Sequence, residues 1–255
     1  MRFSKWHALG NSYLVVERAD AGRLVPEQVR RLCGVDTGIG SDGVLEVVAR
    51  SGARAEIVIW NPDGSIAEMS GNGVRIAARW LSEATGADRV TIVTAGREID
   101  ATMLGGPDVR TEVGEVVVGE PETIDVDGGV ELTTASVGNP HAVIRLDSAT
   151  RDDLLRIGPA VETHGRFPHR TNVQLVRVDG PNKLSVLVWE RGAGETSSSG
   201  SSSAAAAAVA VSRGWCASPV TVHLPGGDLF VELDGLQATL TGPAERICRG
   251  DVDHP

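Results

Sequence analysis

Trp60-Asn-Pro-Asp-Gly-Ser-Ile-Ala-Glu-Met-Ser-Gly-Asn-Gly-Val-Arg-Ile-Ala-Ala-Arg-Trp-Leu81 is the stretch that decides the fold of this chain. It follows an apolar run at residues 57–59 and begins with turn-forming residues at 62–64. After a Gly-Asn-Gly loop at 71–73, apolar residues recur at helical spacing up to Leu81. The order strand, turn, glycine loop and helix places free backbone N–H groups at the positive end of a helix, where a carboxylate or phosphate binds readily.

A second copy of this order occurs at residues 186–200, Val-Leu-Val-Trp189-Glu-Arg-Gly-Ala-Gly-Glu-Thr-Ser-Ser-Ser199-Gly. The interval from Trp60 to Ser70 equals that from Trp189 to Ser199, and a helix-prone run follows at 204–211. Gly-Asn pairs at 10–11 and 138–139 repeat at nearly the same offset. We interpret the chain as a two-fold internal repeat, although Gly- and Ser-rich loops can match by coincidence. By composition residues 197–208 could form a linker, but their place in the repeat favours a helix entry.

Composition limits the class of protein. The chain has 255 residues, a net charge of −10 and no cluster of Lys or Arg, which argues against nucleic-acid or anionic-membrane partners. It has no apolar stretch of membrane-spanning length, and the N-terminus lacks the apolar core of a signal peptide, so we expect a cytoplasmic protein. The three cysteines are scattered, without the spacing of a disulfide framework or a metal site.

Local patterns predict a mixed α and β chain. We expect short helices at 26–33 and 151–162, strands at 13–16, 44–48, 57–60, 173–176 and 185–189, antiparallel sheet over 90–118 and a β-rich segment over 220–247.

The chain resembles diaminopimelate epimerase over nearly its full length. The matching blocks follow the family's order and lie at residues 3–11, 38–43, 61–65, 68–75, 138–141, 167–173 and 190–196. The resemblance implies an α+β fold of two pseudo-symmetric domains, each a β-barrel-like sheet wrapped around a central helix, with the active site in the cleft between them. We expect domains at 1–116 and 117–243, with the tail from about 244 to 255 returning to the first.

The family inverts the α-carbon of an amino acid without pyridoxal phosphate or metal. One thiolate removes the α-proton from one face, and a thiol delivers a proton to the other. An internal repeat suits this chemistry, because it supplies one group for each face, and two helix N-termini stabilise the negative charge that develops. The resemblance therefore implies an amino-acid substrate, no cofactor and no metal, and it leaves a homodimer open.

The sequence departs from the family at both reactive positions, because the two family cysteines fall on Ser70 and Ser199. A thiol titrates near pH 8.5, or lower at a helix N-terminus, whereas an alcohol needs a neighbouring base. Three accounts remain: an engineered double variant, a natural relative with different chemistry, and a binding protein without turnover. Further differences at Ile76, Ala204 and 197–203 favour a natural relative.

The rest of the family's site is retained. By resemblance, the residues that hold the polar groups of the amino acid are Asn11, Asn61, Asn139, Asn172, Glu190 and Arg191. Backbone N–H groups of Gly71, Asn72, Gly200 and Ser201 would bind the carboxylate, and His141 and Glu190 are the titratable groups near the reacting carbon. Each has a purely structural alternative: turn asparagines satisfy local backbone, and Glu190 beside Arg191 could be a surface ion pair. Ser12 and Tyr13 replace a usual Asp-Phe pair, and Val35 replaces a common Arg, which leaves the diaminopimelate specificity open.

The leading hypothesis is a cofactor-independent isomerase or epimerase acting at the α-carbon of an amino acid in a specialised biosynthetic pathway. Ser70 and Ser199 stand where the acid and base normally stand; if they transfer no protons, His141, Glu190, Glu68 or Glu195 could. One rival is a dehydratase or double-bond isomerase on the same fold, and another is a silent amino-acid-binding protein. Exchange of the substrate α-proton with solvent separates an epimerase from a binder.

Overall fold

The computed structural model describes residues 1–253. The chain divides into two compact units, each with its own core. Unit 1 contains Met1–Glu112 together with the C-terminal residues from Gly242, and unit 2 is Val113–Thr241. None of the helices in the described part of the chain is long and apolar enough to cross a membrane.

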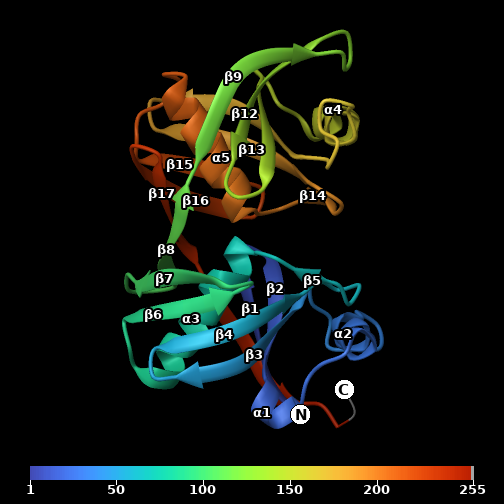
Figure 1. Ribbon diagram of the computed structural model, residues 1–255, viewed down its shortest axis with the longest axis vertical. Coiled ribbons are helices and arrows are strands. Elements are labelled where there is room, and N and C mark those ends of the chain that lie inside the picture. The colour runs from blue at the N-terminus through green and yellow to red at the C-terminus, as the bar shows by residue number, and fades with distance from the viewer. Residues whose placement is uncertain (254–255) are drawn as a thin grey trace. The chain divides into compact units, whose positions relative to one another are not determined.

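Unit 1 is a curved sheet with one central helix (Figure 1). Its strands are β1 (Arg2–Ala8), β2 (Asn11–Glu17), β3 (Val44–Ser51), β4 (Arg54–Trp60), β5 (Ile66–Ala67), β6 (Arg89–Thr94), β7 (Arg97–Met103), the larger part of β8 (Asp108–Glu115), and β18 (Glu245–Asp251). Its helices are α1 (Arg18–Ala21), α2 (Pro26–Cys33) and α3 (Gly71–Thr85).

Unit 2 repeats this arrangement. Its strands are β9 (Val117–Ile124), β10 (Val130–Ser136), β11 (Pro140–Arg145), β12 (Asn172–Gly180), β13 (Lys183–Glu190), β14 (Gly194–Thr196), β15 (Val220–Leu224), β16 (Gly227–Asp234) and most of β17 (Gln237–Pro243). Its helices are α4 (Arg151–Glu162) and α5 (Gly200–Ser212).

The strand pairings confirm the internal repeat. In unit 1, β1–β2 is antiparallel, β2–β3 parallel, β3–β4 antiparallel, β4–β6 parallel and β6–β7 antiparallel. In unit 2 the same sequence of directions runs through β10–β11, β11–β12, β12–β13, β13–β15 and β15–β16. A further antiparallel strand joins each first strand, β18 on β1 and β9 on β10.

Helix α3 forms where the glycine loop predicts it. Ser70 is the N-cap, and its hydroxyl accepts a hydrogen bond from the Gly73 backbone N–H at 3.0 Å, which satisfies one of the first-turn donors. Gly86 ends the helix in the left-handed conformation that glycine adopts without steric cost. Ile76, Ala77 and Leu81 are fully buried in the core of unit 1.

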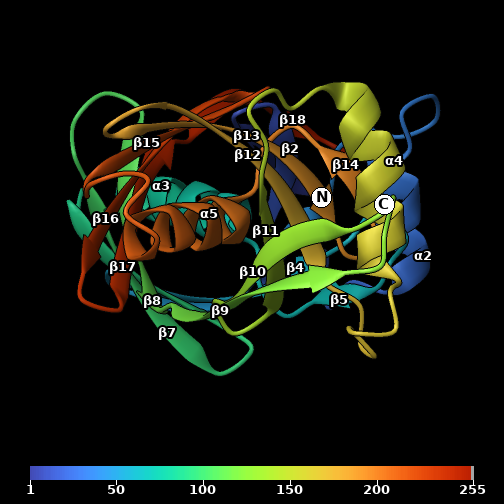
Figure 2. The ribbon, with the colours of Figure 1, turned by 90° about the horizontal axis from the view of Figure 1, so that it is seen from above.

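Helix α5 is buried on all sides rather than on one stripe. Its alanine-rich run from Ala204 to Ala210 is almost fully inaccessible, and it contacts strands on several sides, including β10, β12 and β16 (Figure 2). A helix that is apolar all round belongs inside a fold, and small side chains allow strands to pack closely around it. The structure thus confirms a helix, not a linker, after Ser199.

The predicted strands are correct in place but too short. β3 continues to Ser51, β4 begins at Arg54 and β13 begins at Lys183, beyond the predicted limits in each case. The extra residues include the exposed Arg50, Arg54 and Lys183 as well as the buried Ala55 and Leu184. One apolar residue between polar neighbours is too short a pattern to extend the predicted strand, although the backbone remains paired.

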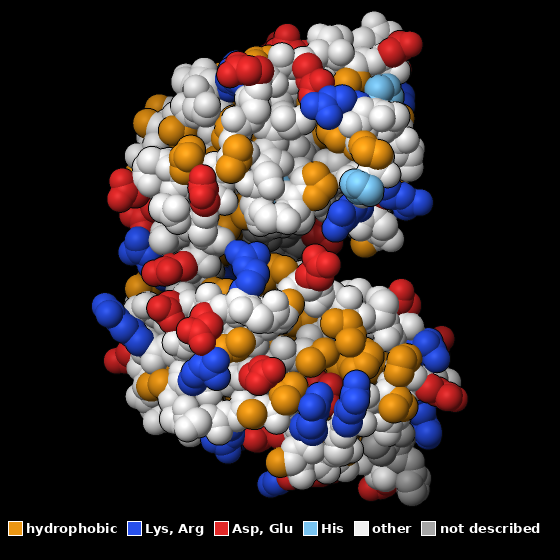
Figure 3. All heavy atoms as spheres, in the orientation of Figure 1, with side chains coloured by type: hydrophobic (Ala, Val, Ile, Leu, Met, Phe, Trp, Pro, Cys, Tyr) orange, Lys and Arg blue, Asp and Glu red, His pale blue; other side chains and the backbone are white. Residues whose placement is uncertain are grey.

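Charged side chains of both signs are interspersed over each unit on the face shown in Figure 3. Several form exposed ion pairs, such as Arg50 with Glu17 and Arg54 with Glu98. Exposed pairs of this kind contribute little to stability, so the core and the buried hydrogen bonds position the site.

Candidate active site

The first candidate cluster, which we call the Ser70 cluster, gathers at the N-terminus of α3. The Tyr13 hydroxyl, from buried β2, donates a hydrogen bond to Ser70 Oγ at 3.1 Å. Asn72 Nδ2 donates to Asn11 Oδ1 at 3.2 Å, so two predicted binding residues from different elements are in contact. With Gly71 at the first helical position, these groups surround backbone N–H groups that have no acceptor within the helix. Such a helix end attracts a carboxylate.

A buried cation lies behind the Ser70 cluster. The Arg75 side chain is inaccessible to solvent and donates to Asn72 Oδ1 at 2.6 Å and to the Gly71 carbonyl at 3.2 Å, while its Nε has no hydrogen-bond partner. Burial lowers the pKa of Arg75 to about 10, so it is still charged at neutral pH. No carboxylate among residues 1–253 forms an ion pair with Arg75, and its charge adds to the positive potential of the α3 N-terminus.

Asn61 occupies the turn that joins β4 to β5. Its side-chain amide donates to Ser65 Oγ at 2.9 Å, and its backbone N–H donates to the Ser65 carbonyl at 2.8 Å. Gly64 in this turn has φ of 85°, and a Cβ there would lie 2.7 Å from the Pro26 carbonyl oxygen. The turn is therefore fixed by close packing on α2, and Asn61 has a local structural role whatever else it binds.

The second cluster, the Ser199 cluster, lies at the N-terminus of α5 and differs in chemistry from the first. Ser199 is buried at the N-cap, but its hydroxyl accepts no bond from the helix backbone. Glu190, at the end of β13, is its partner: burial raises the pKa of Glu190, and a hydrogen bond with Ser199 partly opposes that increase. Gly200 is buried and Ser201 half-buried in the first helical turn. A carboxylate with a raised pKa beside an alcohol is a base and acceptor for that alcohol.

His141, on β11, is held as a neutral ring. Its Nε2 lies 3.0 Å from Asn139 Oδ1, and its Nδ1 lies 3.1 Å from Gln174 Nε2 on β12. The amide donor of Gln174 at Nδ1 favours the tautomer with the proton on Nε2. Burial lowers the pKa of His141 to about 3, so the ring stays uncharged near neutrality. His141 therefore acts as a fixed polar group rather than as a readily titrating base.

Asn172 ties three segments of unit 2 together. Its Nδ2 donates to the Pro140 carbonyl at 2.9 Å, and its Oδ1 accepts from the Arg191 backbone N–H at 3.0 Å. The Arg191 side chain is exposed and reaches the His169 carbonyl at 3.5 Å. Asn172 thus stabilises the turn that carries Glu190 and Arg191. The Arg191 guanidinium is available to an anionic ligand.

The tryptophans that precede the two turns donate to buried carboxylates. Trp60 Nε1 donates to Glu46 at 2.9 Å, and Trp189 Nε1 donates to Glu162 at 2.7 Å. At Glu162, burial alone would raise the pKa, but the bonds from Trp189 and the Gly192 backbone, together with the Arg170 cation, outweigh it and lower the pKa. Both strand ends are therefore anchored where the candidate residues Asn61 and Glu190 follow.

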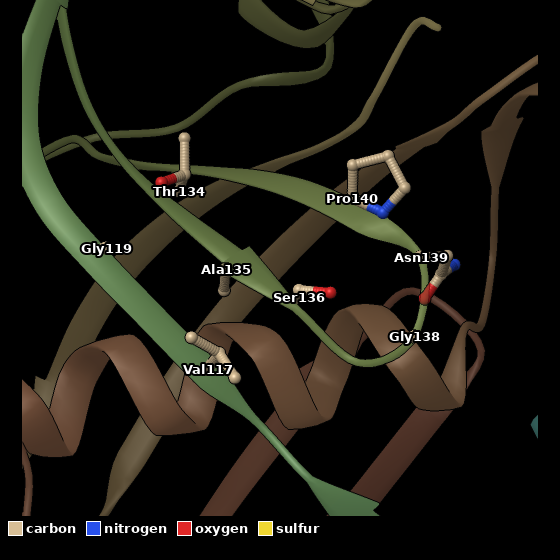
Figure 4. Close-up of a pocket in the computed structure, with 8 residues that line it drawn as sticks. All are labelled: Val117, Gly119, Thr134, Ala135, Ser136, Gly138, Asn139 and Pro140. Atoms are coloured by element: carbon tan, nitrogen blue, oxygen red, sulfur yellow. The ribbon is translucent and has the colours of Figure 1, made fainter.

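A surface pocket of unit 2 includes Asn139, which contacts His141. It lies between β9, β10 and the 137–140 turn, and Figure 4 shows Ser136, Asn139 and Pro140 along one side and Val117 on the helix side. Of the other proton-transfer candidates, Glu195 is exposed and forms an ion pair with Arg151, and Glu68 is exposed beside α3. In the described part of the chain, no three His, Cys, Asp or Glu side chains are grouped to hold a metal ion.

Several members of these clusters are not evident from the sequence. Tyr13 is noted only as a departure from the family, Gln174 lies in an apolar run, and Arg75 reads as a surface residue of a helix. The only available signal is the repeat: Tyr13 and His141 occupy matching places two residues after the Gly-Asn turn residues Asn11 and Asn139.

Comparisons with known proteins identify the family of this chain. The family model for diaminopimelate epimerase matches residues 3–119 and 133–247. A diaminopimelate epimerase 2 of Nostoc sp. is 39% identical over 272 residues, covering 99% of this chain and 95% of the relative. A diaminopimelate epimerase of Desulfitobacterium hafniense is 35% identical over 277 residues, covering 98% of this chain and 97% of the relative.

A solved structure supports the fold independently. A probable proline racemase from Agrobacterium radiobacter, determined with bound carbonate, has a TM-score of 0.76 at 16% identity and covers 100% of this chain and 93% of that one. Family model, curated relatives and duplicated topology agree, and the chain belongs to the diaminopimelate epimerase family.

Proposed function

We propose that this isomerase of the diaminopimelate epimerase family inverts the α-carbon of an amino acid without a cofactor, using Ser70 and Ser199 where the family resemblance implies cysteines. The observation that carries the proposal is the repeated helix entry: each unit places a serine hydroxyl at the N-terminus of its central helix, bonded to a second polar side chain. An α-carbanion needs its negative charge stabilised, and two helix N-termini supply fixed N–H donors for the substrate carboxylate.

Glu190 supplies the basicity that an alcohol lacks. Its raised pKa makes it a stronger proton acceptor than an exposed glutamate, and it bonds with Ser199. As Ser199 Oγ takes the α-proton, its own proton passes to Glu190, so no free alkoxide forms. Because Glu190 must be deprotonated to start this step, the rate should fall as the pH drops through its raised pKa. His141 and Asn139 would form a fixed polar surface of the site and would not exchange protons with the substrate.

The substrate would be bound by the residues that the family pattern places around it. Asn11, Asn72 and Arg191 carry side-chain groups suited to carboxylate and amino groups, and Gly71, Gly200 and Ser201 carry backbone donors of the helix ends. Asn61 and Asn172 make bonds that fix their own turns, and they would shape the site as well as contact the ligand. Diaminopimelate, the substrate named for the curated relatives, is the first amino acid to test.

A dehydratase or double-bond isomerase is the second candidate. It is favoured by the unequal partners of the two serines, because Ser199 has a carboxylate beside it and Ser70 a phenol. Removal of a proton on one face without return to the other needs only one basic side. A silent amino-acid-binding protein is the third candidate, and it would use the same polar clamp.

Solvent deuterium exchange separates these functions. Wild-type protein is incubated in D₂O with diaminopimelate isomers and with a panel of amino acids, and mass spectrometry follows deuterium at the α-carbon while chiral chromatography follows inversion. We expect exchange with inversion for at least one amino acid. Exchange with loss of water or a shifted double bond would select the second candidate, and binding without any exchange would select the third.

The same proposal includes a cytoplasmic location, a role in amino-acid biosynthesis, and no nucleic-acid or membrane partner. A homodimer also belongs to it, and light scattering after size-exclusion chromatography would decide between one and two chains.

A further inference from the structure

We propose that Tyr13 is the proton-relay partner of Ser70. The Tyr13 phenol returns a proton to Ser70 on one face of the substrate, and Glu190 accepts the proton of Ser199 on the other face. The inference rests on the proposed function and adds a residue to it that the family resemblance does not supply, since the usual residue at this position is Phe. Tyr13 acts through Ser70 and is a positioning and relay residue rather than one that touches the substrate.

The geometry fixes the phenol on the serine. The Tyr13 ring is buried on β2, and its hydroxyl donates to Ser70 Oγ at 3.1 Å. The ring lies against Gly43, which directly precedes β3: a Cβ there would come within 2.6 Å of Tyr13 Cε1 and 2.5 Å of the Trp60 carbonyl oxygen. The missing Gly43 side chain thus leaves room for the ring and holds it in place.

The bonds of Ser70 explain why a relay is needed. Ser70 Oγ accepts from both Tyr13 and the Gly73 backbone N–H at 3.0 Å, so its own proton is left to point elsewhere. A hydroxyl with two donated bonds is well prepared to give its proton away, because the charge left on oxygen is stabilised. A phenol, with an ordinary pKa of about 10, is a far better source of the replacement proton than water or an alcohol.

The proton balance closes over one turnover. The α-C–H bond breaks toward Ser199 Oγ, the Ser199 proton passes to Glu190, and the electron pair stays on the substrate. The new C–H bond forms with the Ser70 proton, and the Tyr13 O–H bond breaks to restore the Ser70 hydroxyl. Glu190 ends protonated and Tyr13 ends as a phenolate. Turnover in the reverse direction, or proton exchange with solvent, returns both to their starting states.

The test is a double-mutant cycle of Tyr13→Phe with Ser70→Cys. The change to Phe removes only the hydroxyl and keeps the ring that packs on Gly43. In the Ser70 protein we expect Tyr13→Phe to lower kcat for inversion by about 10²-fold, the lower end of general acid–base effects, with KM little changed. In the Ser70→Cys protein, assayed below the pKa of the new thiol so that the thiol carries the proton it delivers, the same change should leave kcat nearly unaltered, because a thiol gives up its proton without such a partner.

If Tyr13→Phe lowers kcat equally in the Ser70 protein and in the Ser70→Cys protein, the hydroxyl only supports the fold and the relay is wrong. An unchanged kcat in the Ser70 protein would also overturn the relay. A second readout needs no substrate. In Ser70→Cys, site-resolved iodoacetamide alkylation against pH gives the thiol pKa, which Tyr13→Phe should raise because the donated bond stabilises the thiolate. An unchanged thiol pKa overturns the relay. A raised thiol pKa in a protein that exchanges no amino acid counts against the proposed function alone.

Discussion

At the scale of single residues, the two serines are equivalent in position but not in chemistry. Ser70 accepts bonds from a phenol and a backbone N–H, whereas Ser199 contacts a carboxylate whose pKa is raised by burial. A helix N-cap alone would make neither alcohol a base. In the proposed reaction, the partner side chains assign the roles: Ser199 removes the proton and Ser70 delivers one for substrate in one configuration, and the roles are exchanged for the other.

His141 makes a prediction about stability. Its pKa is about 3 in the fold and about 6.5 when unfolded, so between these values the unfolded chain binds the extra proton. The free energy of unfolding that this residue contributes is complete above pH 6.5 and is lost as the pH falls toward 3. From pH 7 to pH 5 we expect a loss of about 2 kcal/mol from this residue.

Urea unfolding at pH 7 and pH 5 measures this loss in wild type and in His141→Gln. The Gln variant retains polar atoms for Asn139 and Gln174 but cannot titrate, so its stability should fall less with pH than that of wild type. The same decrease in both proteins would show that His141 does not have the lowered pKa.

Only those site residues that lie on the repeated motif can be predicted from the sequence. Ser70, Ser199 and their flanking glycines can be predicted because helix entry has a local spacing. The contact of Tyr13 with Ser70 spans 57 positions, and that of Gln174 with His141 spans 33, and no local pattern encodes such cross-strand pairs. The burial of Arg75 is also hidden, because a charged residue on an amphipathic helix normally faces solvent.

At the scale of elements, the two central helices occupy equivalent positions in their units but are stabilised by different interactions. α3 has an N-cap bond and a glycine C-cap, whereas α5 lacks a side-chain cap bond and is enclosed by strands on all sides. Both were predictable in position from the glycine and serine loops. The ends of β3, β4 and β13 were not, because their residues form no longer apolar pattern and it is backbone pairing with a neighbouring strand that defines them.

Helix α4 offers a prediction at this scale. Alanine normally stabilises a helix relative to glycine by about 0.5–1 kcal/mol. At Gly158, however, a Cβ would lie 2.8 Å from Trp189 Cγ and 2.9 Å from Trp189 Cβ. Gly158→Ala should therefore lower the free energy of unfolding by about 1–3 kcal/mol, as overpacking does, by pushing Trp189 from its bond with Glu162.

Chemical denaturation of Gly158→Ala beside Gly165→Ala checks this. A Cβ at Gly165 has open space around it, so the control should differ little from wild type. Gly158→Ala as stable as the control would contradict the packing of α4 on Trp189.

At the scale of the whole molecule, the topology of one unit is duplicated in the other. Each unit carries the same strand order and the same helix entry, so the chain has two serine sites of common geometry. The repeat could be predicted from the matched Trp-to-Ser intervals, and the family and its fold from the resemblance of the seven sequence blocks. The chemistry of each serine could not, because it depends on partners from other strands.

The three native cysteines provide an internal control for restored thiols. Cys33 and Cys216 are buried, and burial raises the pKa of both, while Cys248 is exposed on β18. Iodoacetamide should therefore leave wild-type activity intact and abolish that of a Ser70→Cys, Ser199→Cys protein, with protection by substrate. Substrate-protected inactivation of wild type would instead assign a role to a native cysteine.

The most direct measurement is deuterium incorporation at the α-carbon of diaminopimelate by wild type, Ser70→Ala, Ser199→Ala and the double Ser→Cys variant. Helix N-termini lower thiol pKa values, so the double Cys variant should exchange and invert faster than wild type. The expected gain is about 10²–10⁴-fold, the usual effect of general acid–base catalysis. Each Ala variant should lose inversion, because each face needs its own group. Wild-type inversion that survives both Ala substitutions, or a double Cys variant that binds the amino acid yet gains nothing, would contradict the assignment of proton transfer to Ser70 and Ser199.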